Sequence, residues 1–172
     1  ALEALQKGGV DDLSLRGLAK ATGVTQAAPY SHFRDKDDLL AAAAERGFQR
    51  LALQMASEAA GTRDKKDRVK KLVSAYIRFA AENRTLFQLM FGREFSDMKK
   101  YPTLAMTAGK SYALIAGALT SEKEDTRFLT VCIWSLGHGL ATLFADRKVS
   151  LGQFDAASID DFTERALQTI NI

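Results

Sequence analysis

The chain has 172 residues, enough for one or two domains, and its 47% hydrophobic and 26% charged content is typical of a globular protein and not of a disordered one. We expect no transmembrane span. The single cysteine, Cys132, excludes an intrachain disulfide and fits a reducing cytoplasm. The net charge is +3, but residues 1–61 carry 7 basic and 8 acidic side chains, so charge alone does not predict a nucleic-acid surface at the N-terminal end.

Only helices are predicted, because Ala, Leu, Lys, Arg, Glu and Gln are frequent and alternating β-branched runs are almost absent. The pattern is already helical at Ala1, which predicts that the first helix is truncated at its start. Ser14 then caps a short helix over residues 15–22. Gly23 ends this helix, since glycine adopts a left-handed turn at low cost. The predicted fold class is therefore all-α.

A second short helix follows directly after this glycine turn. Thr25 is placed to cap it over residues 26–33, with its hydroxyl near the first free N–H groups. Asp35 caps a third and longer helix, which apolar residues at helical spacing carry to about residue 60. Gly61 follows it and marks the predicted end of the N-terminal part.

The chain is predicted to divide into an N-terminal domain, residues 1–60, and a C-terminal domain, residues 61–172. Apolar residues at helical spacing predict five helices in the second domain, over residues 64–82, 84–92, 101–120, 124–147 and 155–170. Two polar stretches between them are predicted to be loops, over residues 93–100 and 148–155.

The two short helices and their glycine turn form a helix-turn-helix, whose second helix enters the major groove. Residues 23–33, GVTQAAPYSHF, fit this geometry, since small residues let the helix approach the bases and Gln26 can pair with adenine. Tyr30 and His32 lie further along, where phosphates run. The candidate DNA contacts are Ser14, Arg16, Thr25, Gln26, Ala27, Ala28, Pro29, Tyr30, His32 and Lys36.

Short helix pairs with a glycine turn also occur in helical proteins that never bind DNA. The segment over residues 13–40, however, resembles the helix-turn-helix signature of the TetR family of bacterial transcriptional regulators. The matching parts are Ser14-Leu15-Arg16, Leu18-Ala19…Gly23-Val24, Tyr30…His32-Phe33 and Lys36…Leu39-Leu40. Further along, the chain resembles the C-terminal domain of the TetR subgroup named for its Trp, His and Gly, at Asn83-Arg84…Leu86-Phe87-Gln88-Leu89-Met90-Phe91 and Trp134…His138-Gly139.

This resemblance implies that the C-terminal domain binds a small molecule inside a helical bundle and forms a dimer. Methionine and aromatic side chains suit an adaptable apolar pocket, which predicts a largely apolar effector. The candidate lining is Phe79, Phe87, Met90, Phe91, Met106, Tyr112, Trp134 and His138. A plain hydrophobic core is the alternative explanation for the same residues, and it requires no ligand.

Trp134 and His138 are one helical turn apart and share a face. His138 could be a hydrogen-bonded core histidine, a ligand contact or a metal ligand. No His, Cys or carboxylate cluster has metal-ligand spacing, so we predict neither a metal nor a cofactor. Gly137 and Gly139 leave little bulk on the helix, which predicts a close helix approach, for example at a dimer seam.

Dimerisation has a physical basis, since two helix-turn-helix units related by a twofold axis read a palindrome. The predicted interface consists of the helices over 124–147 and 155–170. Their apolar stripes are Phe128, Leu129, Ile133, Leu136, Leu140 and Leu143, and Phe154, Ile159, Phe162, Ala166 and Ile170. The leading hypothesis is a cytoplasmic homodimeric repressor that binds an operator in double-stranded DNA and is released by a small molecule.

Other functions are weighed against this one. A helical carrier that lacks sequence-specific DNA binding would explain the absence of basic character in residues 1–61, and an activator would share every feature of a repressor. An enzyme is not predicted. The sequence has no glycine-rich phosphate loop, no paired carboxylates in an apolar setting and no nucleophile–base pair near Cys132 or His138.

Overall fold

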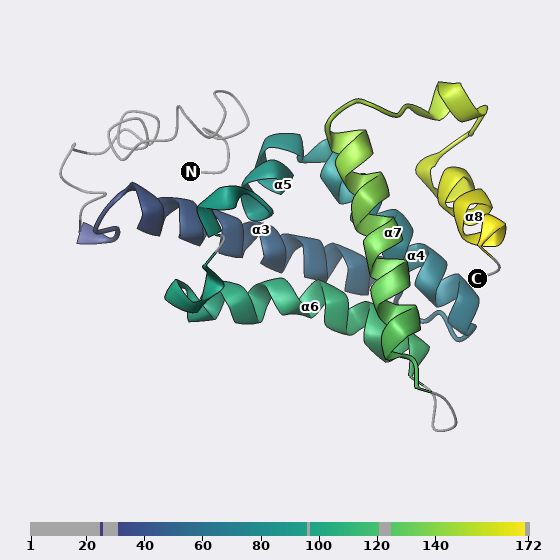
Figure 1. The fold of residues 1–172 in the computed structure, drawn as a ribbon, viewed down its shortest axis with the longest axis horizontal. Coiled ribbons are helices and arrows are strands. Elements are labelled where there is room, and N and C mark those ends of the chain that lie inside the picture. The colour runs from purple at the N-terminus through teal and green to yellow at the C-terminus, as the bar shows by residue number, and fades with distance from the viewer. Residues whose placement is uncertain (1–24, 26–30, 96, 121–124, 171–172) are drawn as a thin grey trace. The chain divides into compact units, whose positions relative to one another are not determined.

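The computed structural model describes residues 25, 31–95, 97–120 and 125–170, and the regular structure among them is entirely helical, which confirms the all-α fold class (Figure 1). The α-helices are α3 Lys36–Glu58, α4 Lys65–Glu82, α5 Arg84–Met90, α6 Pro102–Leu119, α7 Arg127–Ala145 and α8 Ile159–Thr169. Short 3-10 helices lie between some of them: η2 Arg93–Phe95, η3 Met98–Lys100 and η4 Leu151–Phe154.

The start of α3 follows the predicted cap. The Asp38 backbone N–H donates to Asp35 Oδ1 at 2.9 Å, which satisfies one of the open N–H groups at a helix start. The Asp38 carboxylate itself accepts hydrogen bonds from the backbone and guanidinium of Arg34, the shortest at 2.6 Å. At the other end, α3 stops at Glu58, two residues before the predicted end, and Gly61 adopts a left-handed conformation with φ 72°.

The two predicted loops are wrong in part, because 93–100 contains η2 and η3 and 148–155 contains η4. Polar side chains stabilise these short turns locally. The Ser150 N–H donates to the Gln153 side chain at 2.7 Å, and the two residues form a capping box at the start of η4. Asp155 ends η4 in a left-handed conformation with φ 48°, which stops the chain from continuing as a helix there.

The last two helices begin later than predicted. The helix expected over 124–147 is described from Arg127 onward, and the helix expected over 155–170 begins only at Ile159. The start of α8 is fixed by Ser158, whose hydroxyl accepts from the Asp161 N–H at 3.1 Å. This Ser-x-x-Asp cap was not predicted from the sequence.

By its internal contacts, the chain forms two compact units. The first contains Ala1–Gln49 and Asn83–Ala108, and the second contains Arg50–Glu82 and Gly109–Ile172. Both α3 and α6 are continuous helices that contribute residues to each unit. This division by contacts does not test the functional boundary near residue 61, which stays a prediction.

The first unit packs the middle of α3 against α5 and its C-cap residue through aromatic rings. The Phe91 ring lies edge-on to Phe48 at a centroid distance of 5.2 Å and tilted against Phe87 at 4.8 Å. Gly47 brings the two helices close together. A Cβ atom at Gly47 would lie 2.6 Å from Met90 Sδ and 3.0 Å from Leu86 Cδ1. The absence of a side chain at this position therefore sets the spacing of α3 and α5.

Replacing Gly47 with Ala is expected to destabilise the protein by about 1 kcal/mol. Overpacking against Met90, which is buried, costs about 1–3 kcal/mol, and the helix-propensity gain of about 1 kcal/mol offsets only part of it. Gly109→Ala is the matched control, because Gly109 is also helical and nothing lies within 4 Å of its added Cβ. Urea unfolding should show a lower free energy of unfolding for Gly47→Ala and a slightly higher one for Gly109→Ala. An equal increase in both variants would contradict the close approach of α3 and α5.

The second unit is organised around α4, which packs against both α7 and α8 (Figure 1). Its residues 72–77 are all buried, so this stretch has no solvent-facing side. Gly137 on α7 lies next to α4, since its added Cβ would lie 3.4 Å from Val73 Cγ1. This is ordinary van der Waals contact, so the neighbour of Gly137 lies on α4 inside the chain, and the contact does not require a glycine.

Candidate functional site

The predicted DNA-reading segment falls mostly outside the described residues. Among its ten candidate contacts the structure describes Thr25, His32 and Lys36, and all three are exposed. The helices predicted over 15–22 and 26–33 are likewise outside, except for residues 31–33, which are not α-helical. Direct contact of these residues with DNA stays a prediction.

The described residues just after this segment, Arg34 and Asp35, contact Asp38 in the first turn of α3. Arg34 and Asp38 form an ion pair at 2.6 Å, but the Arg34 side chain is 86% exposed, so the pair adds little stability. The Asp35 cap therefore does most to define where α3 begins. Next to this junction the first unit has an open groove of about 280 Å³, lined by His32, Phe33, Asp38, Ala41, Ala42, Glu45, Tyr101, Pro102, Thr103 and Leu104.

The eight predicted effector-site residues are all described, and they lie in both units. Phe87, Met90 and Phe91 belong to the aromatic packing of the first unit. Tyr112, Trp134 and His138 come together in the second unit. Phe79 is fully buried on α4, whereas the Met106 side chain is 66% exposed on α6. Whether any of them lines an effector pocket stays a prediction.

The group in the second unit has a defined geometry. The imidazole of His138 stacks on the indole of Trp134 with an interplanar angle of 12° and a centroid distance of 5.5 Å. Tyr112 meets the same indole edge-on at 6.0 Å. On α4, the Tyr76 hydroxyl lies 3.0 Å from His138 Nδ1. Tyr76 was missed as a site residue, because its helical spacing identified it only as part of the core.

Burial determines the protonation of this pair. It raises the pKa of the Tyr76 phenol, which therefore stays protonated and donates its hydrogen. It lowers the pKa of His138, which is therefore neutral at pH 7. With Tyr76 as the donor to Nδ1, the neutral ring carries its proton on Nε2. This bond satisfies one ring nitrogen, as the core-histidine alternative requires.

The lowered pKa of His138 predicts a pH-dependent stability. The unfolded chain, with a histidine pKa near 6.5, binds a proton before the folded chain does, so stability is complete above about pH 7.5 and falls as the pH drops below 6.5. Thermal unfolding between about pH 5.5 and 7.5 measures this fall. His138→Gln should reduce this loss of stability at low pH, and His32→Gln, at an exposed position, is the control. The same dependence of stability on pH in both variants would contradict the attribution of the loss to His138.

The metal alternative for His138 receives no support in the described residues, where no group of three His, Cys, Asp or Glu side chains could hold a metal ion. Its other two candidate roles, a hydrogen-bonded core histidine and a contact with an effector, both stay predictions. The stacked indole beside it offers an apolar wall, and the ring offers a polar edge.

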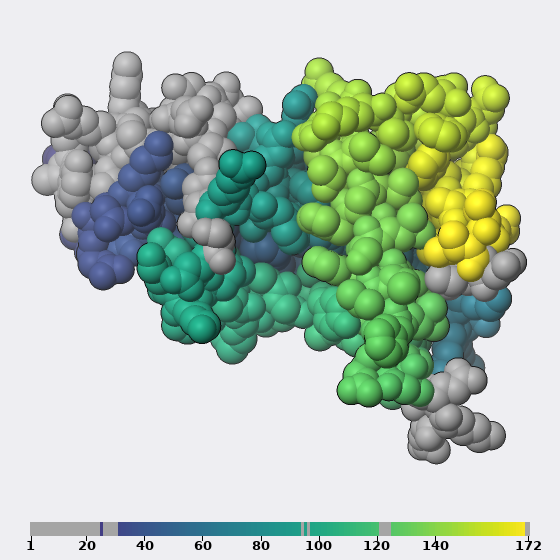
Figure 2. All heavy atoms as spheres, viewed as in Figure 1, coloured from purple at the N-terminus to yellow at the C-terminus, as the bar shows by residue number. Residues whose placement is uncertain are grey.

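The outer side of α7 is apolar and exposed. Phe128 is 79% exposed, and Leu129, Val131, Cys132 and Leu143 are exposed as well. Figure 2 shows this outer surface of α7 uncovered on the side in view. Nothing lies within 4 Å of a Cβ atom built on Gly139, so the chain itself gives no packing reason for this glycine. We call the exposed surface formed by Phe128, Leu129, Val131, Cys132, Gly139 and Leu143 the α7 face.

The predicted apolar stripes of α7 and α8 divide between two sides. Ile133 and Phe162 are buried inside the chain, whereas Phe154 and Ile170 are exposed, as are Phe128, Leu129 and Leu143 of the α7 face. Helical spacing identified the apolar positions, but an apolar stripe wider than one contact surface can pack on its own chain with one side and on a second protein with the other. The part left exposed is available to a second protein surface.

Within the described part of the chain, α7 is also the one helix that is long and apolar enough to cross a membrane by length and composition. Residues 128–145 lack Asp, Glu, Lys and Arg. A single such helix is weak evidence of a span, because an interface helix has the same composition.

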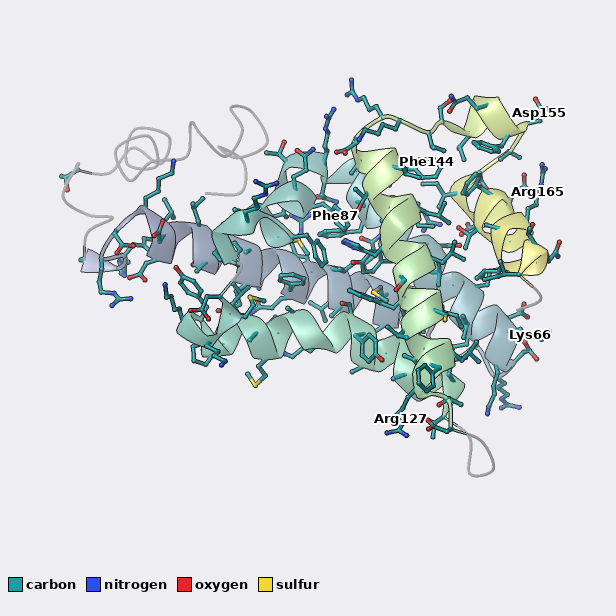
Figure 3. The ribbon with its side chains drawn as sticks, viewed as in Figure 1. Lys66, Phe87, Arg127, Phe144, Asp155 and Arg165 are labelled. Atoms are coloured by element: carbon teal, nitrogen blue, oxygen red, sulfur yellow. The ribbon has the colours of Figure 1, made fainter. Side chains whose placement is uncertain are left out.

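Phe162 fixes the packing of α8 on its neighbours. Its ring lies edge-on to Phe144 of α7 and to Phe154 of η4, at 5.2 Å in each case. Arg165 of α8 donates to the backbone oxygens of Phe154 and Asp155, which ties η4 to α8 (Figure 3). An apolar groove of about 240 Å³ runs along this junction, lined by Phe154, Ala156, Phe162, Arg165, Ala166 and Thr169.

A set of ion pairs joins α4 to its neighbours, and sequence reasoning did not find it. Arg78 of α4 binds Glu58 of α3 at 2.5 Å and Asp160 of α8 at 2.8 Å. Lys70 of α4 binds Glu164 of α8 at 3.4 Å. The signal was present in the spacing, since the two cations are eight residues apart and the two carboxylates of α8 are four apart, each pair on one helix face.

Comparison with known proteins covers nearly the whole chain. A sequence profile for bacterial regulatory proteins of the tetR family matches residues 1–43. A profile for the tetracyclin repressor-like C-terminal domain matches residues 69–170. A search of curated protein sequences gives no match.

Solved structures with a similar fold include a protein of unknown function from Rhodococcus sp. RHA1, which is 32% identical over 98% of this chain and 88% of its own, with a TM-score of 0.81. The regulator FadR from Bacillus subtilis, in complex with stearoyl-CoA, is 15% identical over 98% and 92%, with a TM-score of 0.72. The TetR family regulator PfmR from Thermus thermophilus is 17% identical over 98% and 93%, with a TM-score of 0.67. The last two support the fold alone.

Proposed function

From the premise that this chain belongs to the TetR family of DNA-binding transcriptional regulators, we propose that it is a ligand-responsive repressor that binds a palindromic operator as a homodimer. The observation that carries the proposal is the presence in one chain of a tetR DNA-binding region at 1–43 and a repressor-like C-terminal domain at 69–170. As in its family, regulation and not catalysis is the expected activity, and the cytoplasm is the expected location.

The proposed operator contacts are the ten residues identified in the sequence, with Gln26 reading a base and His32 and Lys36 near phosphates. The exposure of His32 and Lys36 is consistent with this role. Because a single helix-turn-helix covers one half-site, a dimer is needed to read both halves of a palindrome.

The proposed dimer forms through the α7 face and the exposed apolar residues around η4 and α8. Large exposed apolar patches mark interaction surfaces, and here the patch lies on a helix with an open glycine, Gly139, which permits close approach of a partner helix. The twofold operator symmetry and the twofold protein symmetry would then match.

The proposed effector binds the C-terminal domain and is largely apolar. The FadR structure holds stearoyl-CoA, which supports a long apolar ligand for this fold without identifying the ligand of this chain. The stacked Trp134 and His138, followed by Gly139, also support assignment to the Trp-His-Gly subgroup. His138 would supply the polar contact and Trp134 an apolar wall.

The proposed mechanism is a shift between two populations. One conformation places two recognition helices about 34–36 Å apart, one turn of DNA, and the effector favours another spacing. A differential affinity of a few kcal/mol between the two conformations is sufficient. The continuous helix α3 joins the N-terminal region to the second unit and is the proposed lever.

The test is selection of randomised duplex DNA by the protein, followed by binding of the selected pool across a range of salt concentrations. A recovered palindrome bound by two protomers would support the proposal. Salt-sensitive binding without a consensus would indicate non-specific contact only. No binding would instead favour the carrier function, which the slightly acidic balance of residues 1–61 also favours.

A further inference from the structure

One guanidinium in the second unit contacts two helices at once. Arg78 of α4 donates through Nη1 to Glu58 Oε2 at 2.5 Å and through Nη2 to Asp160 Oδ1 at 2.8 Å. Glu58 is the last residue of α3, and Asp160 lies in the first turn of α8. The three residues therefore join the end of one helix to the beginning of another, through the side of a third.

The environment of Arg78 favours this double contact. Its side chain is 27% exposed and that of Glu58 is 30% exposed, so water screens the Arg78–Glu58 contact only in part, whereas Asp160 is 61% exposed and its contact is screened more strongly. Partial burial alone would lower the pKa of Arg78, but the hydrogen bond to Glu58 and the charges of Asp160 and Glu58 raise it. A planar guanidinium can bind two carboxylates with its two ends, which a lysine ammonium on the same stem does less well.

Polar contacts hold much of the seam between α4 and α8. Lys70, Ser74 and Arg78 are spaced by four residues and share one face of α4. The ion pairs made by Lys70 and Arg78 flank the middle of this seam. There the buried hydroxyls of Ser74 and Thr163 have no hydrogen-bond partner in the described residues. Unpaired buried hydroxyls weaken the seam, so its ion pairs matter more for keeping α8 in place.

The short length of α8 also makes its ion pairs with α4 more important for keeping it in place. The helix has 11 residues, too few to be stable in isolation, and only Phe162, Thr163 and Leu167 are buried. The contact of Asp160 with Arg78 therefore adds to the Ser158 cap and the Phe162 packing in positioning its first turn. Because Asp160 and Glu58 share Arg78, a displacement of α8 changes how tightly the last turn of α3 is held.

We infer that Arg78 is a positioning residue that couples α8 to the end of α3, so that a change at the dimer helices is transmitted to the helix leading to the DNA-reading segment. The inference rests on the proposed function for the roles of α8 in the dimer and α3 as the lever. The coupling itself involves three side chains of one chain and can be measured without DNA.

The test is amide hydrogen exchange in the protein without DNA. Asp160→Asn removes a charge from α8 and should accelerate exchange in the last turn of α3, residues 55–58, by about fivefold. Asp161→Asn is the matched control, since Asp161 lies in the same turn but binds Arg165 and the Ala157 N–H. Equal acceleration by both variants would reduce the effect to fraying of α8 and overturn the coupling.

A double substitution tests whether Asp160 acts on α3 through Arg78. If Asp160 acts on α3 only through Arg78, Arg78→Gln should accelerate exchange at residues 55–58, and adding Asp160→Asn to it should change exchange there no further. Arg78→Lys, which keeps the charge but not the two-ended geometry, should restore less than the wild-type protection. Additive effects of Arg78→Gln and Asp160→Asn would overturn the inference.

Operator binding separates this inference from the proposed function. If Asp160→Asn alters exchange in α3 but neither the wild type nor the variant binds a selected duplex, the proposed function fails and the coupling stands. If the wild type binds a palindrome and α3 is unaffected by Asp160→Asn, the coupling fails and the proposed function stands. When both hold, Asp160→Asn should shift operator affinity while Asp161→Asn leaves it near the wild-type value.

Discussion

Replacing Gly139 with Glu is expected to make the protein monomeric and to weaken operator binding about 100-fold, because a monomer engages one half-site and loses the gain from two linked contacts. Nothing lies within 4 Å of an added Cβ at this position, so the fold of the single chain has room for the new side chain. Glu also has a higher helix propensity than Gly. Sedimentation and operator titration measure the two effects.

Gly117→Glu is the matched control for this variant. Gly117 is also a helical glycine with nothing within 4 Å of its added Cβ, but it lies on α6. We expect it to remain dimeric and to bind the operator with wild-type affinity. A dimeric Gly139→Glu protein, or the same loss in both variants, would show that the α7 face is not the interface.

Truncating Phe79 to Ala is expected to destabilise the protein by about 3–5 kcal/mol, the usual cost of removing a large ring from a core. Phe79 is 1% exposed and ranks among the largest fully buried side chains described. This loss is a large part of the total stability of a typical domain. Urea unfolding followed by circular dichroism measures it.

Leu53→Ala is the control for Phe79, because Leu53 is 68% exposed and its truncation should change stability by less than about 0.5 kcal/mol. The size of the Phe79 effect also tests its role. A ring that lines an open effector pocket leaves little new cavity when removed, so a loss below about 1 kcal/mol would favour the pocket lining over the plain core.

Local features of the fold were predictable from the sequence because they depend on residues close together in the chain. The Asp35 cap defines the start of α3, and Gly61 follows its end in a left-handed turn. Helices α4 and α6 lie within a residue or two of their predicted bounds for the same reason. The 3-10 turns were missed, because capping boxes as short as Ser150–Gln153 leave no helical periodicity to detect.

Contacts between helices were less predictable. Helical spacing placed Ile133 and Phe128 in one apolar stripe, but the structure buries the first and exposes the second. Spacing cannot decide which side of a wide stripe meets the same chain. Likewise, the pairing of Arg78 with Glu58 and Asp160 depends on three helices far apart in sequence. Helical spacing placed Trp134 and His138 on one face, and only the structure added Tyr112 to them.

The stacking of His138 on Trp134 gives the protein a built-in optical reporter. The chain contains one tryptophan, so its intrinsic indole emission comes from a single place. A protonated imidazole quenches indole emission by electron transfer more strongly than a neutral one. With the rings stacked at 5.5 Å, a pH titration of the fluorescence would therefore follow the charge on His138, and an effector that parts the two rings would change the signal without any label.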